Sequence, residues 1–410
     1  MAHRFVGYFE NWAQYRPAGN GQFLPAQIDA GLFTHINHAF AIFGFVTKSV
    51  APTNPHLTGD YTVQPVEWND QTVLYPALQG LKGSNPGLKT LLSIGGWSFN
   101  DPQDVNQIGT LTYQLFSQMA STPAGRAQFI SSAIAYAQKY GFDGLDIDWE
   151  FPGYAGRGGT PADLTNFLSL AQELRAAAPS GFLLSMASPA IVPSGLPAQY
   201  HSDPGSYFAW LAQCAQQFDW LNVMSYDYHG AFDSPTAIGT GANAPLAQDS
   251  TPNGPFSVKQ TVDAYLGAGI PADKVVLGVP TYGRSYSGVN GNHSFGQPFS
   301  GAGPAGAATQ VPGVLAFYEI QDQIASGSLV QQWDSTTLTP IAYSSSNGEF
   351  VTFDNPESVG YKSAFINARG LGGAMAWSID DDDFGNGYPL LTRIKAILDN
   401  PHPARSYRQI

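Results

Sequence analysis

The sequence contains only one cysteine, Cys214, among its 410 residues. No disulfide can therefore form within these residues, and no metal site can be built from cysteine thiolates. Cys214 lies in an apolar stretch with helical spacing, which is typical of a buried, unreactive thiol rather than a nucleophile.

Charged residues are also scarce, at 12% of the chain, and basic residues are the scarcer kind, with 18 Lys and Arg against 31 Asp and Glu. The formal charge of -13 repels phosphate backbones and anionic lipid headgroups, so we expect neither nucleic acid nor a membrane as a partner. No apolar run reaches the roughly 18 residues of a membrane-spanning helix. Hydrophobic residues still make up 43%, which predicts a folded globular protein.

The length fits two or three domains, or one large α/β barrel with an insertion, at roughly 150 residues per domain. Short apolar and β-branched runs alternate with helical patterns, which implies right-handed crossovers and a parallel sheet. Eight such units favour a closed (β/α)8 TIM barrel over an open doubly wound sheet, and no G-x-G-x-x-G follows the first strand. The predicted strands are 5–9, 35–40, 90–94, 144–149, 183–187, 220–224, 275–279 and 374–378.

Two Thr-Pro pairs predict helix starts, at Thr122-Pro123 and at Thr160-Pro161. Threonine is a good N-cap and proline fits the first helical position. Apolar residues then repeat every three or four positions after each pair, as expected for helices packed on a barrel.

The alternation breaks once, between the seventh and eighth strands, where several short strands and one helix are predicted. Asn347-Gly348 there is a strong signal for an antiparallel hairpin. Because this segment leaves from the carboxyl end of a barrel strand, it should form one wall of a cleft on the active face. We therefore predict a catalytic barrel over residues 1–286 and 355–400, a small α+β insertion domain over 287–354, and a C-terminal tail over 401–410.

The fourth predicted strand carries Asp146, Asp148 and Glu150, which are two residues apart. In an extended strand all three side chains leave the same face, towards the end of the strand that forms the barrel mouth. Carboxylates crowded in this way cannot all be ionised cheaply, so at least one should hold a proton near neutral pH. Glu150 projects furthest and is the predicted general acid, whereas Asp143 has the opposite parity and a structural role.

Two other interpretations of these acids are a solvated strand face and a site for a hard cation such as Ca²⁺ or Mg²⁺. A solvated face is disfavoured because Leu145, Ile147 and Trp149 would face the helices and leave the acids inside the barrel. A metal site is disfavoured because the neighbouring strand ends supply aromatic residues instead of further ligands. We expect no metal.

Aromatic and polar residues lie at the ends of six of the predicted strands, and the acids of the fourth strand make seven. Aromatic rings at a barrel mouth offer flat apolar platforms for sugars, while Tyr and Asp give oriented hydrogen bonds to hydroxyl or amide groups. A neutral polysaccharide fits this set better than a charged metabolite. The residues are Tyr8, Trp12, Phe40, Trp97, Met224, Tyr226, Asp227, Tyr282, Arg284 and Trp377.

With these residues the chain resembles the glycoside hydrolase family 18 chitinases. Residues 143–150, DGLDIDWE, match the family's D-x-x-D-x-D-x-E signature in full. Unlike the family's non-catalytic lectins, the chain keeps Glu150. The insertion is similar to the α+β module of the deep-cleft subgroup, with FYE at 317–319 in a recognisable segment. Further matches are SIGG at 93–96 for the S-x-G-G motif, MSYD at 224–227, YGR at 282–284 and GGAMAW at 372–377.

The resemblance implies retaining hydrolysis of β-1,4-linked N-acetylglucosamine polymers, in which the substrate's own N-acetyl group is the nucleophile. Glu150 would protonate the glycosidic oxygen and later activate water, and Asp148 would hold the amide N–H. Asp146, helped by Ser93, would share a proton with Asp148. Tyr226 and Asp227 would orient the acetyl group, and Trp377 would floor the sugar ring. The remaining substrate-binding residues would be Tyr8, Trp12, Phe40, Ser93, Gly96, Trp97, Met224, Tyr282 and Arg284.

The expected partner is thus chitin or chito-oligosaccharides, bound by a monomer without a metal or organic cofactor. Secretion is expected because chitin is insoluble and extracellular, with any export signal removed or absent, since residues 1–4 lead directly into a strand pattern. Three rival functions remain: an endo-β-N-acetylglucosaminidase acting on N-glycans, a non-hydrolytic chitin-binding lectin, and a metal-dependent barrel hydrolase.

Two weaker features lie near the predicted site. Asp380 to Asp383 form a run of four acids, which predicts a solvated loop or helix cap rather than a metal cage. His229 follows the Tyr226-Asp227 pair, and it either braces that pair or is an ordinary hydrogen-bonded loop histidine.

Overall fold

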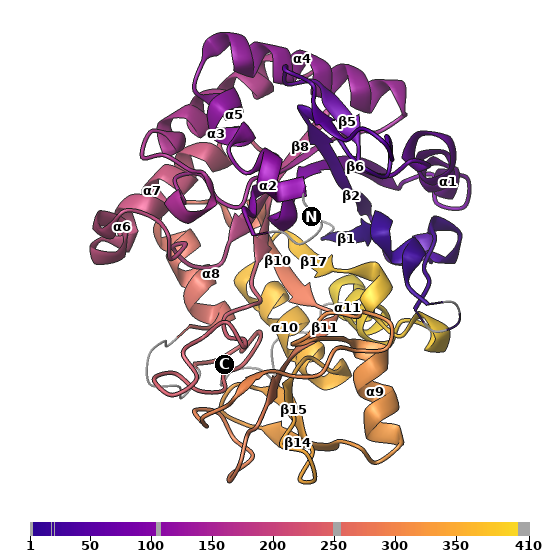
Figure 1. Ribbon diagram of the computed structural model, residues 1–410, viewed down its shortest axis with the longest axis vertical. Coiled ribbons are helices and arrows are strands. Elements are labelled where there is room, and N and C mark those ends of the chain that lie inside the picture. Colours follow the sequence, from indigo (N-terminus) through magenta and orange to yellow (C-terminus); the bar gives the residue numbers. More distant parts are fainter. Residues whose placement is uncertain (1–2, 18, 20, 104–107, 249–255, 401–410) are drawn as a thin grey trace.

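The computed structural model describes residues 3–17, 19, 21–103, 108–248 and 256–400, so the predicted tail lies outside the described residues. In this part of the chain eight parallel strands form a closed barrel, because β1 pairs with both β2 and β17 (Figure 1). The predicted TIM barrel is confirmed. Its strands are β1 (Arg4–Glu10), β2 (His35–Phe43), β6 (Lys89–Gly95), β7 (Gly144–Asp148), β8 (Leu183–Pro189), β9 (Trp220–Met224), β10 (Val275–Pro280) and β17 (Gly373–Trp377).

Helices connect the barrel strands and cover the outside of the barrel (Figure 1). The longest begins as predicted, with the Thr122 side chain accepting a hydrogen bond from the Gly125 N–H and Pro123 in the first turn. None of the helices in the described ranges is long and apolar enough to cross a membrane. They are α1 (Tyr75–Gly80), α2 (Ile108–Thr112), α3 (Leu115–Ala120), α4 (Pro123–Lys139), α5 (Asp163–Ala177), α6 (Ala198–Ser202), α7 (Pro204–Ala215), α8 (Val258–Gly267), α10 (Pro356–Arg369) and α11 (Pro389–Asp399).

The helix start predicted at Thr160-Pro161 is wrong by two residues, because α5 begins at Asp163 and not at Pro161. The Asp163 carboxylate accepts hydrogen bonds from the Thr160 N–H at 2.8 Å and the Thr160 hydroxyl at 2.7 Å. It also accepts from the Gly153 N–H at 3.2 Å. Thr160 therefore donates to a buried acid at the helix start instead of capping the helix itself.

A second sheet follows β10 and lies below the barrel in Figure 1, in orange. The predicted hairpin around Asn347-Gly348 is confirmed, since β15 and β16 pair antiparallel on either side of it. The sheet starts at Tyr282, before the boundary predicted at residue 287, and the division into two domains stays a prediction. The elements are β11 (Tyr282–Ser287), β12 (Gly301–Ala302), β13 (Val314–Ala316), α9 (Phe317–Ala325), β14 (Val330–Asp334), β15 (Thr339–Tyr343) and β16 (Phe350–Thr352).

The barrel core has two parts that follow the alternation of each strand. Leu145 and Ile147 of β7 belong to the large cluster between strands and helices. A smaller apolar cluster, which includes Leu91 and Trp220, lies on the opposite face of the strands, inside the barrel. The acids of β7 share this inner face, so they stand on a packed apolar floor.

A buried ion pair ties the end of the second sheet to the barrel. Lys362 of α10 contacts both oxygens of Asp354, at 2.7 and 2.6 Å, and both side chains are almost completely buried. Asp354 also accepts from the Ser358 hydroxyl at 2.6 Å. Removing one partner would leave the other charge buried without compensation, which is far costlier than losing an exposed pair.

We therefore expect Lys362→Met to lower the free energy of unfolding by about 3–5 kcal/mol, measured by denaturant titration. Lys395→Met is the matched control, because the Lys395–Asp399 pair is partly exposed and should contribute about 0.5 kcal/mol or less. Adding Asp354→Leu to Lys362→Met should restore part of the loss. Equal losses in the two single variants would contradict this account.

Candidate active site

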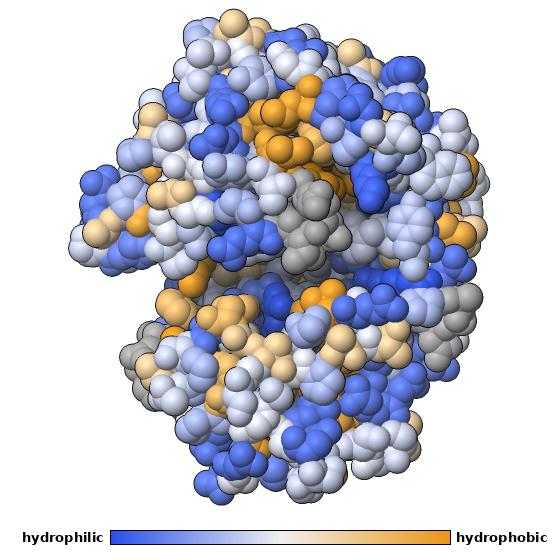
Figure 2. All heavy atoms as spheres, viewed as in Figure 1, coloured by the Kyte–Doolittle hydropathy of each residue, from blue (hydrophilic) through white to orange (hydrophobic). Residues whose placement is uncertain are grey.

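Most of the predicted site residues lie near or just after the carboxyl ends of the barrel strands, and the second sheet leaves the barrel from the same end of β10. Figure 2 shows that one face of the molecule is hollowed between the barrel and the part below it that holds the second sheet. A hollow between a barrel mouth and an inserted wall is a common place for a ligand in this architecture.

The three acids of the fourth barrel strand become less buried towards its end. Asp146 and Asp148 are the third and fifth residues of β7, and Glu150 follows two residues later. Asp146 is 0% exposed and Asp148 is 3% exposed, whereas Glu150 is only partly buried. The structure thus brings the three acids together as a column with Glu150 outermost.

Asp146, at the base of the column, is held by four neutral donors from four different strands. Tyr8 and Ser93 each donate a hydroxyl hydrogen bond to Oδ2 at 2.7 Å. Ser185 donates to Oδ1 at 2.6 Å and the Asn222 amide donates to it at 3.1 Å. Burial raises the pKa of Asp146, and these four hydrogen bonds oppose that rise.

Asp148 has much less hydrogen-bonding support than Asp146. Its Oδ1 atom is buried and has no hydrogen-bond partner among the described residues. Burial, and then the charges of Glu150 and Asp146, raise the pKa of Asp148 well above its usual value. Proton sharing between Asp148 and Asp146 stays a prediction, since the oxygens of Asp146 accept their hydrogen bonds from other residues.

The acidity of Glu150 is shifted to the neutral range. Burial raises its pKa to about 7, the positive charge of Arg157 opposes the rise, and the negative charge of Asp227 adds to it. Because Asp148 and Glu150 also repel each other, the pair retains a proton near pH 7. A carboxylic acid protonated at this pH, at the mouth of a barrel, can act as a general acid.

Two glycines at the carboxyl end of β6 leave room for this column and for the ring of Phe40. Gly95 has φ +120°, and a Cβ there would lie 2.1 Å from the Asp148 carbonyl oxygen. Gly96 has φ +90°, and a Cβ there would lie 2.5 Å from the ring of Phe40. Both glycines of the S-x-G-G segment are therefore explained. A side chain at either position would collide with a neighbouring residue, and residues with a Cβ disfavour such positive φ angles.

Aromatic rings from three strand ends pack together beside the acids. Phe40 stacks on Trp377 with ring centroids 5.7 Å apart, and Trp12 stacks on Phe40 at 5.9 Å. Trp12 is 37% exposed and Trp377 is partly exposed, so they can offer ring faces to a ligand. Tyr8 packs against Trp377 at 5.2 Å but is 1% exposed, so it supports the wall and binds Asp146 rather than presenting a surface.

Asp227 links the barrel to the second sheet. Arg284 donates from Nε to its Oδ1 at 2.7 Å and from Nη2 to its Oδ2 at 2.6 Å, a bidentate pair. The Tyr282 hydroxyl donates to Oδ1 at 2.7 Å. Neighbouring Tyr226 is buried, with its hydroxyl 3.9 Å from the Met375 sulfur, and partly exposed Met224 ends β9 beside it.

Trp97 is half exposed, and sequence reasoning missed the arginine that binds it. The Arg157 guanidinium lies over the indole ring, 3.4 Å from its centroid, and donates to the Trp97 carbonyl. Arg157 Nε also donates to the Glu150 carbonyl at 2.9 Å. Ser185 and Asn222 were missed too, although both share the inward face of their strands. The bounds of those strands would have sufficed to find them.

The expected solvated loop at Asp380 to Asp383 is wrong for its first three residues, which are buried. Arg16 contacts carboxylate oxygens of Asp380 at 3.0 Å and Asp381 at 2.9 Å, and of Glu10 at 2.8 Å. The acids are buried because this arginine lies among them. Asp382 serves as the predicted helix cap, accepting from the N–H groups that begin α11. His229 contacts Asp233 at 2.8 Å within its own loop.

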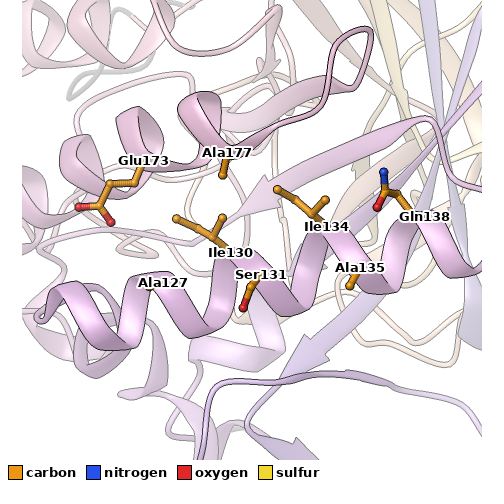
Figure 3. Close-up of a pocket in the computed structure, with 8 residues that line it drawn as sticks. All are labelled: Ala127, Ile130, Ser131, Ile134, Ala135, Gln138, Glu173 and Ala177. Atoms are coloured by element: carbon orange, nitrogen blue, oxygen red, sulfur yellow. The ribbon is translucent and has the colours of Figure 1, made fainter.

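Another hollow, of about 580 Å³, lies between α4 and α5 on the outside of the barrel (Figure 3). Most of its lining is aliphatic, including Ile130 and Ile134, and its carboxylate, Glu173, is bound by Arg126 at 2.7 Å. No predicted site residue lines it. We therefore place the candidate active site at the ends of the barrel strands and not in this hollow.

Comparison with known proteins points to one family. The sequence model of the Glycosyl hydrolases family 18 matches residues 4–382. Mouse Chitotriosidase-1 is 34% identical over 421 aligned positions, which cover 100% of this chain and 81% of that protein.

Solved structures of a chitinase and of a pseudo-chitinase are similar to this chain over almost its whole length. A Group IV chitinase of Ostrinia furnacalis in complex with allosamidin has a TM-score of 0.81 and 31% identity, covering 98% of this chain and 100% of that one. Human YKL-39, described as a pseudo-chitinase with retained chitooligosaccharide binding, has a TM-score of 0.78 and 30% identity, covering 97% and 100%.

The raised pKa of Glu150 predicts a pH-dependent cost to stability. The folded state holds this proton up to about pH 7, whereas a glutamate in the unfolded chain loses it near pH 4.5. Wild-type stability should therefore fall between these values and stay lower above them. Glu150→Gln removes this loss. In denaturant titrations the free energy of unfolding of the variant, relative to that of the wild type, should therefore be higher at pH 8 than at pH 5. If the free energies of unfolding of variant and wild type differ by the same amount at both pH values, the raised pKa of Glu150 is contradicted.

Proposed function

Because the chain belongs to the glycosyl hydrolases of family 18, we propose that it is a chitinase that hydrolyses β-1,4-linked N-acetylglucosamine polymers with retention. The observation that carries the proposal is the position of Glu150, partly exposed at the outer end of a column of three acids, where burial raises its pKa to about 7. A protonated acid beside a partly exposed aromatic wall is suited to cleaving a bond between neutral sugars.

In the first step Glu150 donates its proton to the glycosidic oxygen as the bond to C1 breaks. The carbonyl oxygen of the substrate's own N-acetyl group attacks C1 and forms a cyclic oxazolinium ion, so no protein nucleophile is needed. In the second step the Glu150 carboxylate takes a proton from water, which attacks C1 and reopens the ring. The proton returned to Glu150 completes the cycle.

Asp148 stabilises the positive charge that develops on the acetamido group. Its Oδ1 has no other hydrogen-bond partner among the described residues, so it is free to accept the amide N–H. Asp146 below it supplies a fixed negative field, because four hydrogen bonds hold its carboxylate in place. Preorganised charge of this kind favours the transition state without reorganisation during the reaction.

The remaining residues position the sugar. Trp377 floors the ring at the cleavage site, while Tyr226 and Asp227 orient the acetyl group, a proximity effect that contributes several kcal/mol in well-oriented reactions. Arg284 and Tyr282 fix the Asp227 carboxylate, which supports a defined position for it. Neighbouring sugars rest on Trp12, Trp97 and Met224, and the buried Phe40 supports this wall by stacking on Trp12 and Trp377. All these residues come from one chain, so a monomer suffices, and extracellular action suits an insoluble polymer.

Glu150→Gln should leave binding of an N-acetylglucosamine hexamer measurable and lower its turnover by about 10²-fold or more, because the proton donor is lost. Glu349→Gln, in the hairpin of the second sheet, is the matched control and should keep wild-type turnover. A loss below about tenfold, roughly 1.4 kcal/mol of barrier, would overturn the general-acid assignment. Binding without turnover in the wild type would indicate a lectin, and cleavage of N-glycans but not of the hexamer would indicate an endo-β-N-acetylglucosaminidase.

An otherwise matched hexamer without N-acetyl groups should not be cleaved, because the nucleophile belongs to the acetamido group. Product analysis of the two hexamers under the same conditions measures this difference. The acetylated hexamer should release products that first appear as the β-anomer, as retention requires. Hydrolysis of the deacetylated hexamer would mean that a protein carboxylate acts as nucleophile.

A further inference from the structure

Arg157 joins the loop that carries the proposed general acid to the loop that carries an exposed tryptophan. It ends the short helical turn Ala155–Arg157 after β7, and it is 6% exposed. Its Nε donates to the main-chain carbonyl of Glu150 at 2.9 Å, and Nη2 donates to the main-chain carbonyl of Trp97. One side chain therefore fixes the backbone at both positions.

The same guanidinium also covers one face of the Trp97 ring. Its carbon lies 3.4 Å from the centroid of the ring, although Trp97 remains 51% exposed. A planar cation stacked on an indole restricts the ring, and the free face stays available to a ligand. Lysine has no such plane, so an ammonium could supply the charge but not the stack.

Arg157 is the cation among the charged groups that act on Glu150. From its own strand Glu150 faces Asp148, and from the loop after β9 it faces Asp227 and the buried Tyr226 hydroxyl. Asp101 approaches Arg157 at 3.9 Å from the loop after β6, and Tyr154 acts on Arg157 from its own loop. The acids that surround Glu150 favour its protonated form, and Arg157 works against them.

We propose that Arg157 is a positioning residue for the hydrolysis, which holds Glu150 and Trp97 in one rigid unit and keeps a positive charge beside the general acid. The inference rests on the proposed function, because it assumes that Glu150 is that acid. It assigns two separable effects to one side chain. The charge sets the pH range in which Glu150 is protonated, and the planar stack sets the affinity for a sugar on Trp97.

Two substitutions of Arg157 separate these effects in pH profiles of kcat/KM for an N-acetylglucosamine hexamer. Arg157→Met removes the charge, so the alkaline limb, which reports loss of the proton from Glu150, should move to higher pH by at least about half a unit. Arg157→Lys keeps the charge and loses the stack, so its alkaline limb should stay near that of the wild type. Its binding of the hexamer, measured in the inactive Glu150→Gln background, should weaken about two- to fivefold.

Asp101→Asn tests the charge effect with the opposite sign. Asp101 is partly exposed, and its removal leaves the charge of Arg157 less compensated, so the alkaline limb should move to lower pH. Arg175→Met is the matched control. Arg175 also donates Nε to a main-chain carbonyl, that of Gln217, and contacts Asp219 just before β9, at the other end of the barrel. This control should leave the alkaline limb unchanged.

A proton titration reports the same charge effect without turnover. The difference in proton binding between wild type and Glu150→Gln gives the titration of the Glu150 pair, and its midpoint should rise when Arg157→Met is added to both proteins. An unmoved midpoint and unmoved alkaline limbs in Arg157→Met and Asp101→Asn would overturn the proposal, even if activity fell. If Arg157→Met does not fold, Asp101→Asn decides on its own. A midpoint that moves in a protein without hydrolytic activity would instead overturn the proposed function.

Discussion

The site depends on the crowding of three carboxyl groups on one face of one strand. Water is largely excluded from Asp146 and Asp148, so each negative charge added to the column raises the free energy of the others. The molecule meets this cost in two ways. It surrounds the innermost acid with hydrogen-bond donors, and it leaves the outer pair with a proton at neutral pH. The crowding that disfavours ionisation is thus also the source of the acid.

The surroundings of the column are built by the closed barrel. Tyr8, Ser93, Ser185 and Asn222 come from β1, β6, β8 and β9, and they reach one carboxylate because the inward positions of parallel strands lie at similar heights. Gly95 then lets the end of β6 pass close to Asp148 without a side chain in between, and Gly96 leaves room for the ring of Phe40. An open sheet would bring only its immediate neighbours to the same carboxylate.

Regular periodicity explains which parts could be predicted from the sequence. The eight strands, the hairpin at Asn347-Gly348 and the parity of Asp146, Asp148 and Glu150 all follow from local spacing, and the structure has each of them. The partners that reach the site from irregular segments could not be found in this way. Arg157 lies on a short turn, and Arg16 lies beyond β1, so no period fixes where either side chain points. The acids after β17 are buried because Arg16 compensates their charge. Local spacing does not reveal where Arg16 lies, so a solvated loop was expected there. Asp163 shows the same limit, because its carboxylate also accepts hydrogen bonds from Ser117 and Gly153, which local spacing does not reveal.

The second sheet is attached to the barrel by charge at both ends of its path. Near its start, Arg284 of β11 is bound to Asp227 of a barrel loop, and after its last strand Asp354 is bound to Lys362 of α10. Each contact has one partner in the inserted stretch or at its edge and the other in the barrel. Transplanting residues 282–354 onto a foreign scaffold would therefore separate Arg284 from Asp227 and Asp354 from Lys362. The cleft wall and its host barrel are constrained to change together rather than as exchangeable parts.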